Sequence, residues 1–170
     1  IPKLTPNVDD IAVIGRAAVE GGAAGLCAIN TAGPGYTESH GYPVLSNGMG
    51  GMSGKGVLPL TLKALTALRA ETDLPLIGCG GLSSAADCRA AAGCGATIFG
   101  IGSGLTGMNT ADIAAYFATV ANDLESGTEQ AGQLVRFDVD MAFKPYRVVA
   151  NDVVCEDITV VTLDGDLDIR

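Results

Sequence analysis

Over the first 126 residues, short apolar runs alternate with longer segments in which apolar positions recur every three or four residues. The short runs have the length and near-continuous apolar character of buried parallel strands, and they lie at 1–4, 25–30, 74–79 and 96–100. The longer segments have the periodicity of one helix face, and they lie at 8–20, 57–71, 84–92 and 113–124. This alternation predicts an α/β fold with a parallel sheet and right-handed crossovers. Four βα units are half of the eight that close a (β/α)8 TIM barrel.

Local signals mark where some of these elements begin. Asn7, with Asp10 three residues later, is predicted to cap the first helix, and Ser84 with Asp87 is predicted to cap the third. Residues 31–56 are polar and rich in glycine, so we expect one long loop there.

The pattern changes after residue 126. We predict that 1–126 form the half-barrel, that 127–145 form a linker, and that 146–170 form a separate, short antiparallel β segment. The predicted strands and turns of that segment are, in chain order, 146–150, Asn151-Asp152, 158–163 and Asp164-Gly165.

Charge and hydropathy narrow the partners. The net charge is −9, with 10 acidic and 6 basic residues before position 127 and 9 and 4 from there to the end. Nucleic-acid binding needs clustered Lys and Arg, so we expect no nucleic-acid partner. No apolar run approaches the ~20 residues of a membrane span, and no signal peptide is visible, so we expect a cytoplasmic protein without a membrane partner. Because the chain opens on Ile1, we expect it to be a fragment.

Cysteine and histidine usage argues against a metal centre. The five cysteines are irregularly spaced, which favours small buried side chains over a disulfide framework or an iron–sulfur cluster. His40 is the only histidine and stands in a polar segment, where a solvated side chain is the expected role. No second His and no acid cluster has the spacing of metal ligands, so we expect no metal site.

Glycine follows two successive predicted strands. Gly80 and Gly81 come after one strand, and Gly102 with Ser103 comes after the next. Ligands of parallel α/β folds lie at the carboxyl ends of the strands, and glycine there lets peptide N–H groups approach an anion. The two pairs predict a phosphate site. Alternatively, they only make tight turns.

Two further strand ends carry polar residues. Lys3 ends an apolar strand, where it is either solvated or a cation for an electron-rich ring. Asn30 ends the second strand, where its amide either caps the backbone or clamps a planar amide or imide.

Five ordered segments carry a resemblance to a known family. They are KLTPNVDDI at 3–11, AINT at 28–31, PVLSNGMGGMSG at 43–54, IGCGGLSSAAD at 77–87 and IFGIGSGL at 98–105. These segments resemble strand-end motifs of dihydroorotate dehydrogenases, most of all the class 1B catalytic subunit. The resemblance covers about residues 1–125 and implies the C-terminal half of an FMN-binding TIM barrel.

The resemblance also implies roles for individual residues. The cofactor FMN would contact residues at every strand end, namely Lys3, Ile29, Gly54, Gly80, Gly81, Gly102 and Ser103. Asn30 and Thr31 would bind the substrate, dihydroorotate or orotate. The implied activity is oxidation of dihydroorotate to orotate in pyrimidine biosynthesis.

The chain departs from the family pattern in two ways. The family's catalytic base, a Cys or Ser in the first half of the barrel, has no counterpart here, so no catalytic residue is assigned. Residues 145–170 resemble the opening hairpin of a ferredoxin-reductase-like β-barrel, which implies an electron-transfer subunit or domain as partner. FAD and a 2Fe-2S cluster are expected only on that module, electrons would pass towards NAD, and an oligomer is expected.

Three other functions stay open. The chain is alternatively part of another FMN barrel that acts on pyrimidines, such as a dihydropyrimidine dehydrogenase-like enzyme. It is alternatively part of a non-redox phosphate-binding barrel, or a half-barrel that serves assembly without catalysis.

Overall fold

A computed structural model describes residues 1–127, 147–155 and 158–164, the last two ranges by their backbone alone. The chain divides into two compact units, Ile1–Leu134 and Val135–Arg170. The first unit carries the α/β pattern, and the second carries the β segment.

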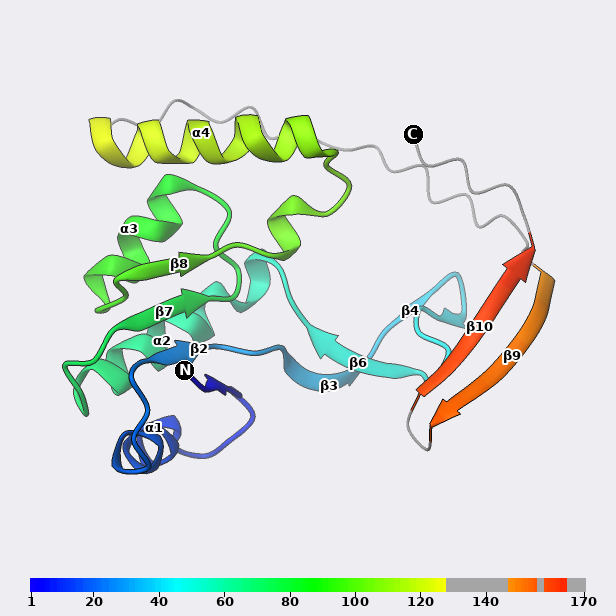
Figure 1. Ribbon diagram of the computed structural model, residues 1–170, viewed down its shortest axis with the longest axis horizontal. Helices are drawn as coiled ribbons and strands as arrows, with labels where there is room; N and C mark the ends of the chain where they lie inside the picture. Colours follow the sequence, from blue (N-terminus) through cyan, green and yellow to red (C-terminus); the bar gives the residue numbers. More distant parts are fainter. Residues whose placement is uncertain (128–146, 156–157, 165–170) are drawn as a thin grey trace. The chain divides into compact units, whose positions relative to one another are not determined.

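A four-stranded parallel sheet organises the first unit (Figure 1). Its strands follow chain order, with β1 (Lys3–Leu4) next to β2 (Leu26–Ala28), then β7 (Leu76–Cys79), then β8 (Ile98–Gly100). Each neighbouring pair is parallel. Strands and helices alternate along the chain, so the predicted α/β class is confirmed, and the sheet is consistent with part of a TIM barrel.

Four helices connect and follow these strands. They are α1 (Ile11–Glu20), α2 (Leu58–Arg69), α3 (Ala85–Gly93) and α4 (Thr110–Ser126). Each helix packs against the next one in the chain, as the helices around a barrel do.

Side-chain caps set where these helices begin. The predicted Ser84 cap of α3 is confirmed, because the Ser84 hydroxyl accepts a hydrogen bond from the Asp87 N–H at 3.2 Å. The predicted Asn7 cap of α1 is wrong. Asp10 caps that helix by accepting from Ala12 N–H at 2.9 Å. The Asn7 side chain instead binds the next strand connection, donating to Thr31 O at 3.2 Å and accepting from Gly33 N–H at 2.8 Å.

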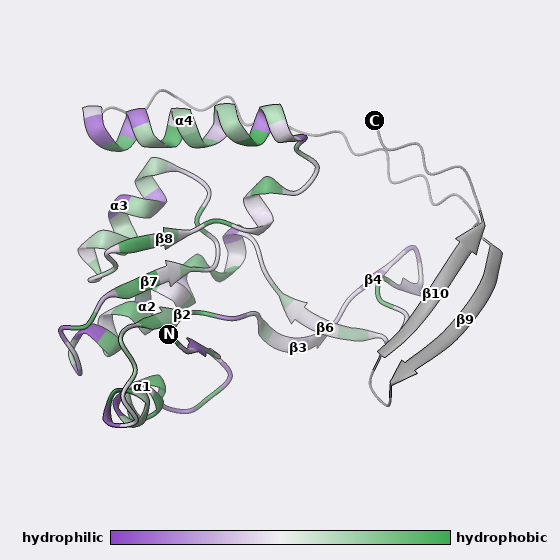
Figure 2. Cartoon of the chain, viewed as in Figure 1, coloured by the Kyte–Doolittle hydropathy of each residue, from purple (hydrophilic) through white to green (hydrophobic). Residues whose placement is uncertain are grey.

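The core lies between the sheet and its helices. Alternate strand residues such as Leu26, Ala28 and Leu76 point to the helices and are fully buried. Cys27 and Ile77 point to the opposite face and are half-buried, and Ile98 on that face is 49% exposed. Figure 2 shows apolar residues along β2, β7 and β8. The sheet is therefore apolar on both faces, as the strands of a barrel are.

Residues 31–56 are not one loop. They contain the antiparallel pair β3 (Ala32–Tyr36) and β6 (Met49–Met52), which extends away from the strand ends of the sheet (Figure 1). Between them lies a second small pair, β4 (Glu38–Ser39) and β5 (Tyr42–Pro43). A 3-10 turn, η1 (Lys55–Val57), leads into α2. The loop prediction failed because β4 and β5 are only two residues long and β3 and β6 are rich in Gly, so no alternation of apolar and polar positions marks these strands.

The second unit contains one antiparallel pair, β9 (Arg147–Cys155) with β10 (Ile158–Asp164). The predicted antiparallel strands are confirmed. The predicted turn at Asn151-Asp152 is wrong, because both residues lie inside β9 and pair with β10. Gly165 of the other predicted turn and residues 128–145 of the predicted linker lie outside the described residues.

Candidate functional site

A cavity of about 460 Å³ opens at the carboxyl ends of the sheet strands. Ligand pockets span roughly 300–1,000 Å³, so this volume suits a ligand of cofactor size. All nine residues that the sequence predicts to bind FMN or substrate line this cavity, although they lie up to 100 positions apart in the chain. They are Lys3, Ile29, Asn30, Thr31, Gly54, Gly80, Gly81, Gly102 and Ser103.

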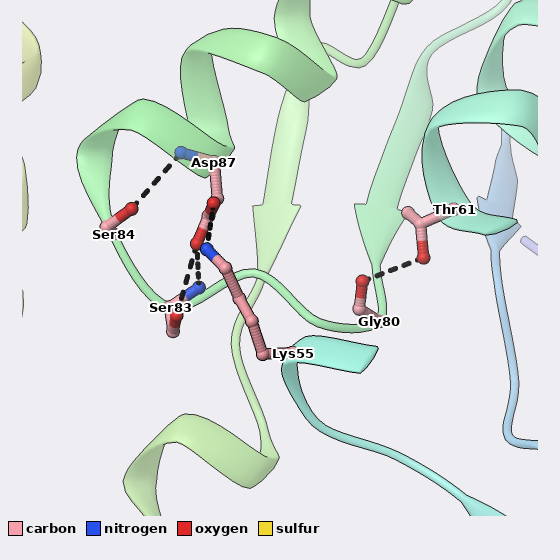
Figure 3. A network of polar contacts seen from close by, with 6 residues as sticks. All are labelled: Lys55, Thr61, Gly80, Ser83, Ser84 and Asp87. Carbon is pink, nitrogen blue, oxygen red and sulfur yellow. Dashed lines mark hydrogen bonds and ion pairs between the residues drawn. The ribbon is translucent and has the colours of Figure 1, made fainter. Parts of the chain in front are cut away.

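Two glycines shape the turn after β7. Gly80 and Gly81 have φ of +117° and +78°, a region that side chains disfavour. A Cβ on Gly81 would lie 2.6 Å from the Leu58 nitrogen, so this turn packs directly on the start of α2. Buried Thr61, on α2, donates to Gly80 O at 2.7 Å and holds the turn in place (Figure 3).

Peptide N–H groups are left free around this part of the cavity. Within the described residues, the N–H groups of Gly81, Gly102 and Ser103 donate to no acceptor. Gly54 has φ of +84°, and nothing lies within 4 Å of where its Cβ would be. Free N–H groups on glycine turns form a ready site for an anion such as a phosphate.

Three loops converge there. The Ser103 hydroxyl, on the 3-10 turn η2 (Ser103–Leu105), donates to the Ser53 hydroxyl at 2.8 Å. A Cβ on Gly104 would lie 3.4 Å from Ser83 Cβ. The loops that follow β6, β7 and β8 therefore meet at one end of the cavity.

A charged network joins two of these loops (Figure 3). The Lys55 ammonium donates to the Asp87 carboxylate, which also accepts from Ser83 N–H at 2.9 Å and from the Ser83 hydroxyl at 3.1 Å. Burial alone would raise the pKa of Asp87, but the hydrogen bonds from Lys55 and Ser83 outweigh it and lower that pKa. Asp87 is therefore a charged carboxylate beside the cavity, and both of its oxygens accept hydrogen bonds.

At the β1 end of the cavity, the Lys3 ammonium donates to the Cys79 sulfur at 3.4 Å. Cys27 is close by on β2. Burial raises the pKa of the Cys27 thiol, the neighbouring Cys79 adds to the rise, and Lys3 opposes it. Lys3 thus supplies the positive charge at this end.

Residues 29–31, which follow β2, also line the cavity. Ile29 is almost fully buried, and its N–H donates to Cys79 O at 2.5 Å. The Asn30 side-chain oxygen accepts from Thr31 N–H at 2.9 Å, so the backbone-capping role occupies that oxygen in this structure. Its amide nitrogen has no partner in the described part of the chain, and Asn30 is one of the residues that line the cavity.

Sequence reasoning missed several residues that line the cavity, among them Ser53, Lys55, Cys79 and Ser83. Ser53 lies inside the quoted motif at 43–54, Cys79 and Ser83 lie inside the motif at 77–87, and Lys55 directly follows Gly54, so these positions were the signal that could have pointed to them. His40 lies outside the cavity as an exposed residue next to Ser39, which confirms its predicted solvated role.

The described residues contain neither a metal-ligand cluster nor a membrane span. No three His, Cys, Asp or Glu side chains among them lie close enough to hold a metal ion. Their helices all lack the length and apolar character that a bilayer-spanning helix needs. Four of the cysteines, Cys27, Cys79, Cys88 and Cys94, are free thiols.

Comparison with known proteins gives a consistent match. The family model described as dihydroorotate dehydrogenase matches residues 1–122. A Methanosarcina acetivorans protein named dihydroorotate dehydrogenase B (NAD(+)), catalytic subunit, is 40% identical over 131 residues, which cover 76% of this chain and 40% of that protein.

Two other relatives match shorter stretches. A Methanosarcina mazei protein of the same name is 51% identical over 83 residues, 48% of this chain and 26% of that protein. A Lactiplantibacillus plantarum protein named dihydroorotate dehydrogenase A (fumarate) is 49% identical over 86 residues, 50% of this chain and 28% of that protein. The matches thus span well under half the length of these relatives.

Proposed function

This chain belongs to the dihydroorotate dehydrogenase family, and from that premise we propose what its parent protein does. We propose that the protein carrying this chain oxidises dihydroorotate to orotate with bound FMN. This reaction belongs to pyrimidine biosynthesis. The observation that supports the proposal most is the single cavity lined by all nine residues nominated for FMN and substrate.

The glycine turns suit the phosphate end of FMN. The free N–H groups of Gly81, Gly102 and Ser103 would donate to the phosphate oxygens. Glycine at Gly80 and Gly54 would keep side chains out of the space that the phosphate and ribityl chain need. No atom lies within 4 Å of the Cβ position at Gly54, so the space next to this glycine is open.

Lys3 and Ile29 suit the ring end. Bound FMN supplies a hydride acceptor, which is chemistry that no protein side chain offers. The Lys3 ammonium would stabilise negative charge on the ring from its place beside Cys79. Ile29 would pack against the ring edge and exclude water.

Asn30 and Thr31 suit the substrate. The free amide nitrogen of Asn30 would donate to a carbonyl oxygen of dihydroorotate, and Thr31 would add a hydroxyl beside it. Oxidation also removes a proton from the substrate carbon, and none of the described residues is assigned as the base. We assign that base to a preceding half of the barrel.

We further propose that the chain is the C-terminal half of such a barrel, followed by the opening of an electron-transfer module at 146–170. Support comes from the four βα units and from relatives named catalytic subunits that use NAD(+). Electrons would pass to NAD through FAD and a 2Fe-2S cluster on that module. A cytoplasmic oligomer is the expected setting.

The test is direct. The natural polypeptide that carries this chain is purified and its absorbance recorded before and after anaerobic addition of dihydroorotate. We expect a yellow protein whose flavin absorbance bleaches with dihydroorotate but not with dihydrouracil. Bleaching by dihydrouracil alone favours the other pyrimidine-acting barrel, and a colourless, inert protein rules out the proposal.

A further inference from the structure

Of the two cations among the described residues that line the cavity, Lys3 and Lys55, the proposed function leaves Lys55 without a role. Lys55 lines the cavity together with Ser53 and Gly54. The loops that follow β7 and β8 contribute Gly81 and Ser103 to the same lining. Its side chain is 61% exposed, so packing alone does not fix the ammonium group. What fixes it in this structure is the Asp87 carboxylate, whose side chain is only 7% exposed.

Asp87 has the properties of an anchor. Two hydrogen bonds from Ser83 hold its carboxylate, and the Ser84 hydroxyl accepts from its N–H at 3.2 Å. It thereby joins the loop after β7 to the loop after β6, which lie 32 residues apart in the chain. A carboxylate next to a phosphate site would repel the anion unless a cation lay between them.

We propose that Asp87 is a positioning residue that holds Lys55 at the phosphate end of the cavity and so makes the site select FMN over riboflavin. This inference rests on the proposed function, because it assumes that the cavity binds a flavin. Lys55 contributes charge that only the phosphorylated flavin needs. Asp87 acts through Lys55 and touches neither flavin.

Selectivity is measured as the ratio of the riboflavin and FMN dissociation constants, from quenching of flavin fluorescence. The protein is the natural polypeptide that carries this chain, stripped of flavin. We expect Lys55→Gln and Asp87→Asn each to lower the ratio by roughly tenfold, because one charge-assisted contact with the phosphate is lost. Riboflavin affinity should stay within about twofold, because riboflavin has no phosphate.

The chain offers a matched control for each variant. Lys63→Gln removes the same charge from an exposed site on α2 outside the cavity. Asp112 stands on α4 as Asp87 stands on α3, with its N–H donating to the helix cap, Asn109, at 3.0 Å. Asp112→Asn therefore repeats the change at the helix start without touching Lys55. Both controls should leave the ratio unchanged.

The double variant Lys55→Gln/Asp87→Asn tests whether Asp87 acts through Lys55. We expect the double variant to lose no more selectivity than Lys55→Gln alone. Additive losses overturn the inference, and so does a higher or unchanged ratio in Asp87→Asn. If Asp87→Asn does not fold, Asp87→Glu takes its place, because it keeps the charge but displaces it, and an unchanged ratio there also overturns the inference.

Failure of the proposed function has a different signature. In that case the unsubstituted protein binds neither flavin. If it binds both flavins with unchanged selectivity in every variant, only the role of Asp87 and Lys55 is wrong.

Discussion

At the scale of single residues, Lys3 is the most informative side chain of the ring end. Its ammonium lies 3.4 Å from the Cys79 sulfur at the carboxyl edge of the sheet. Lys3→Met keeps the length of the side chain and removes its charge. We expect the rate of flavin bleaching by dihydroorotate to fall by roughly 100-fold, as when one preorganised stabilising donor is removed.

Rapid-mixing absorbance measurements on the natural polypeptide would check this. Lys63→Met is the matched control, because Lys63 is exposed on α2 and lies outside the cavity. An unchanged bleaching rate in Lys3→Met would contradict the role given to Lys3.

Cys27 gives a prediction about pH. Burial, followed by the neighbouring Cys79, raises the pKa of Cys27 above its usual value of 9.0, so little of it is thiolate at neutral pH. Iodoacetamide reacts with the thiolate, so we expect the midpoint of the Cys27 labelling curve in this chain to lie above pH 9.0. Mass spectrometry of the labelled peptide at a series of pH values measures this.

Lys3 determines the direction in which a substitution should shift the pKa of Cys27. Because Lys3 lowers this pKa, Lys3→Met should move the Cys27 labelling curve to still higher pH. A midpoint below 9.0 in the unsubstituted chain would contradict the assignment.

The sequence was enough to predict which residues at the strand ends line the cavity. It was not enough to predict which side chains bind one another. Parallel strands end at one edge, so any polar residue or glycine there reaches the same cavity. Lys55 and Asp87 are different, because they meet only once two loops pack together. The sequence likewise predicts Asn7 as a local cap, whereas its side-chain partners lie 24 and 26 residues away.

At the scale of elements, Arg69 fastens the amino end of the sheet. From the end of α2 its guanidinium donates to the carbonyl oxygens of Thr72, Leu74 and Gly95, at 2.8, 3.1 and 2.8 Å. We expect Arg69→Met to lower the free energy of unfolding by about 3 kcal/mol, because several charge-assisted hydrogen bonds are lost.

Arg16 provides the comparison in the same denaturant titration. It pairs with Glu71 at 2.8 Å on the surface, where its side chain is 51% exposed. Surface pairs contribute about 0–1 kcal/mol, so Arg16→Met should be nearly neutral. Equal losses in the two variants would mean that Arg69 is only another surface cation.

The turn after β7 also makes a testable element. A Cβ on Gly81 would lie 2.6 Å from the Leu58 nitrogen, so Gly81→Ala must push the turn away from α2. We expect FMN binding to weaken by at least roughly tenfold, since the shift misplaces the free N–H groups. Flavin fluorescence titration measures the change.

Gly22→Ala separates this packing effect from backbone strain. Gly22 also has a positive φ, +90°, but nothing lies within 4 Å of its Cβ position. The substitution should cost about 1 kcal/mol of stability and leave FMN binding unchanged. Weaker binding in both variants would point to strain alone.

Helices and strands were predictable where apolar residues recur with a regular spacing along the sequence. The four sheet strands and four helices follow the apolar pattern, because burial against one common core imposes that pattern. The pairs β3–β6 and β4–β5 escaped it. Tyr36, Tyr42 and Met52 on them are exposed, so no buried face imposes an alternation of apolar and polar residues.

At the scale of the whole molecule, the sheet has two unpaired edges, β1 and β8, within the described residues. The face away from the helices carries the half-buried Cys27 and Ile77 and the exposed Ile98. A closed barrel pairs both edges and buries this face. We therefore expect the chain by itself to self-associate and to bind a dye specific for exposed apolar surface.

Supplying a polypeptide with the four βα units proposed to precede this chain should replace self-association with a one-to-one complex, measured by light scattering after gel filtration. Ile98→Lys should reduce self-association of the chain alone and also prevent that complex, since a charge on this face opposes both contacts. Ile14→Lys is the control, because Ile14 is 43% exposed on α1, close to the 49% of Ile98, but lies on a helix. A stable monomer that binds no dye would contradict the proposal that this chain is half of a barrel.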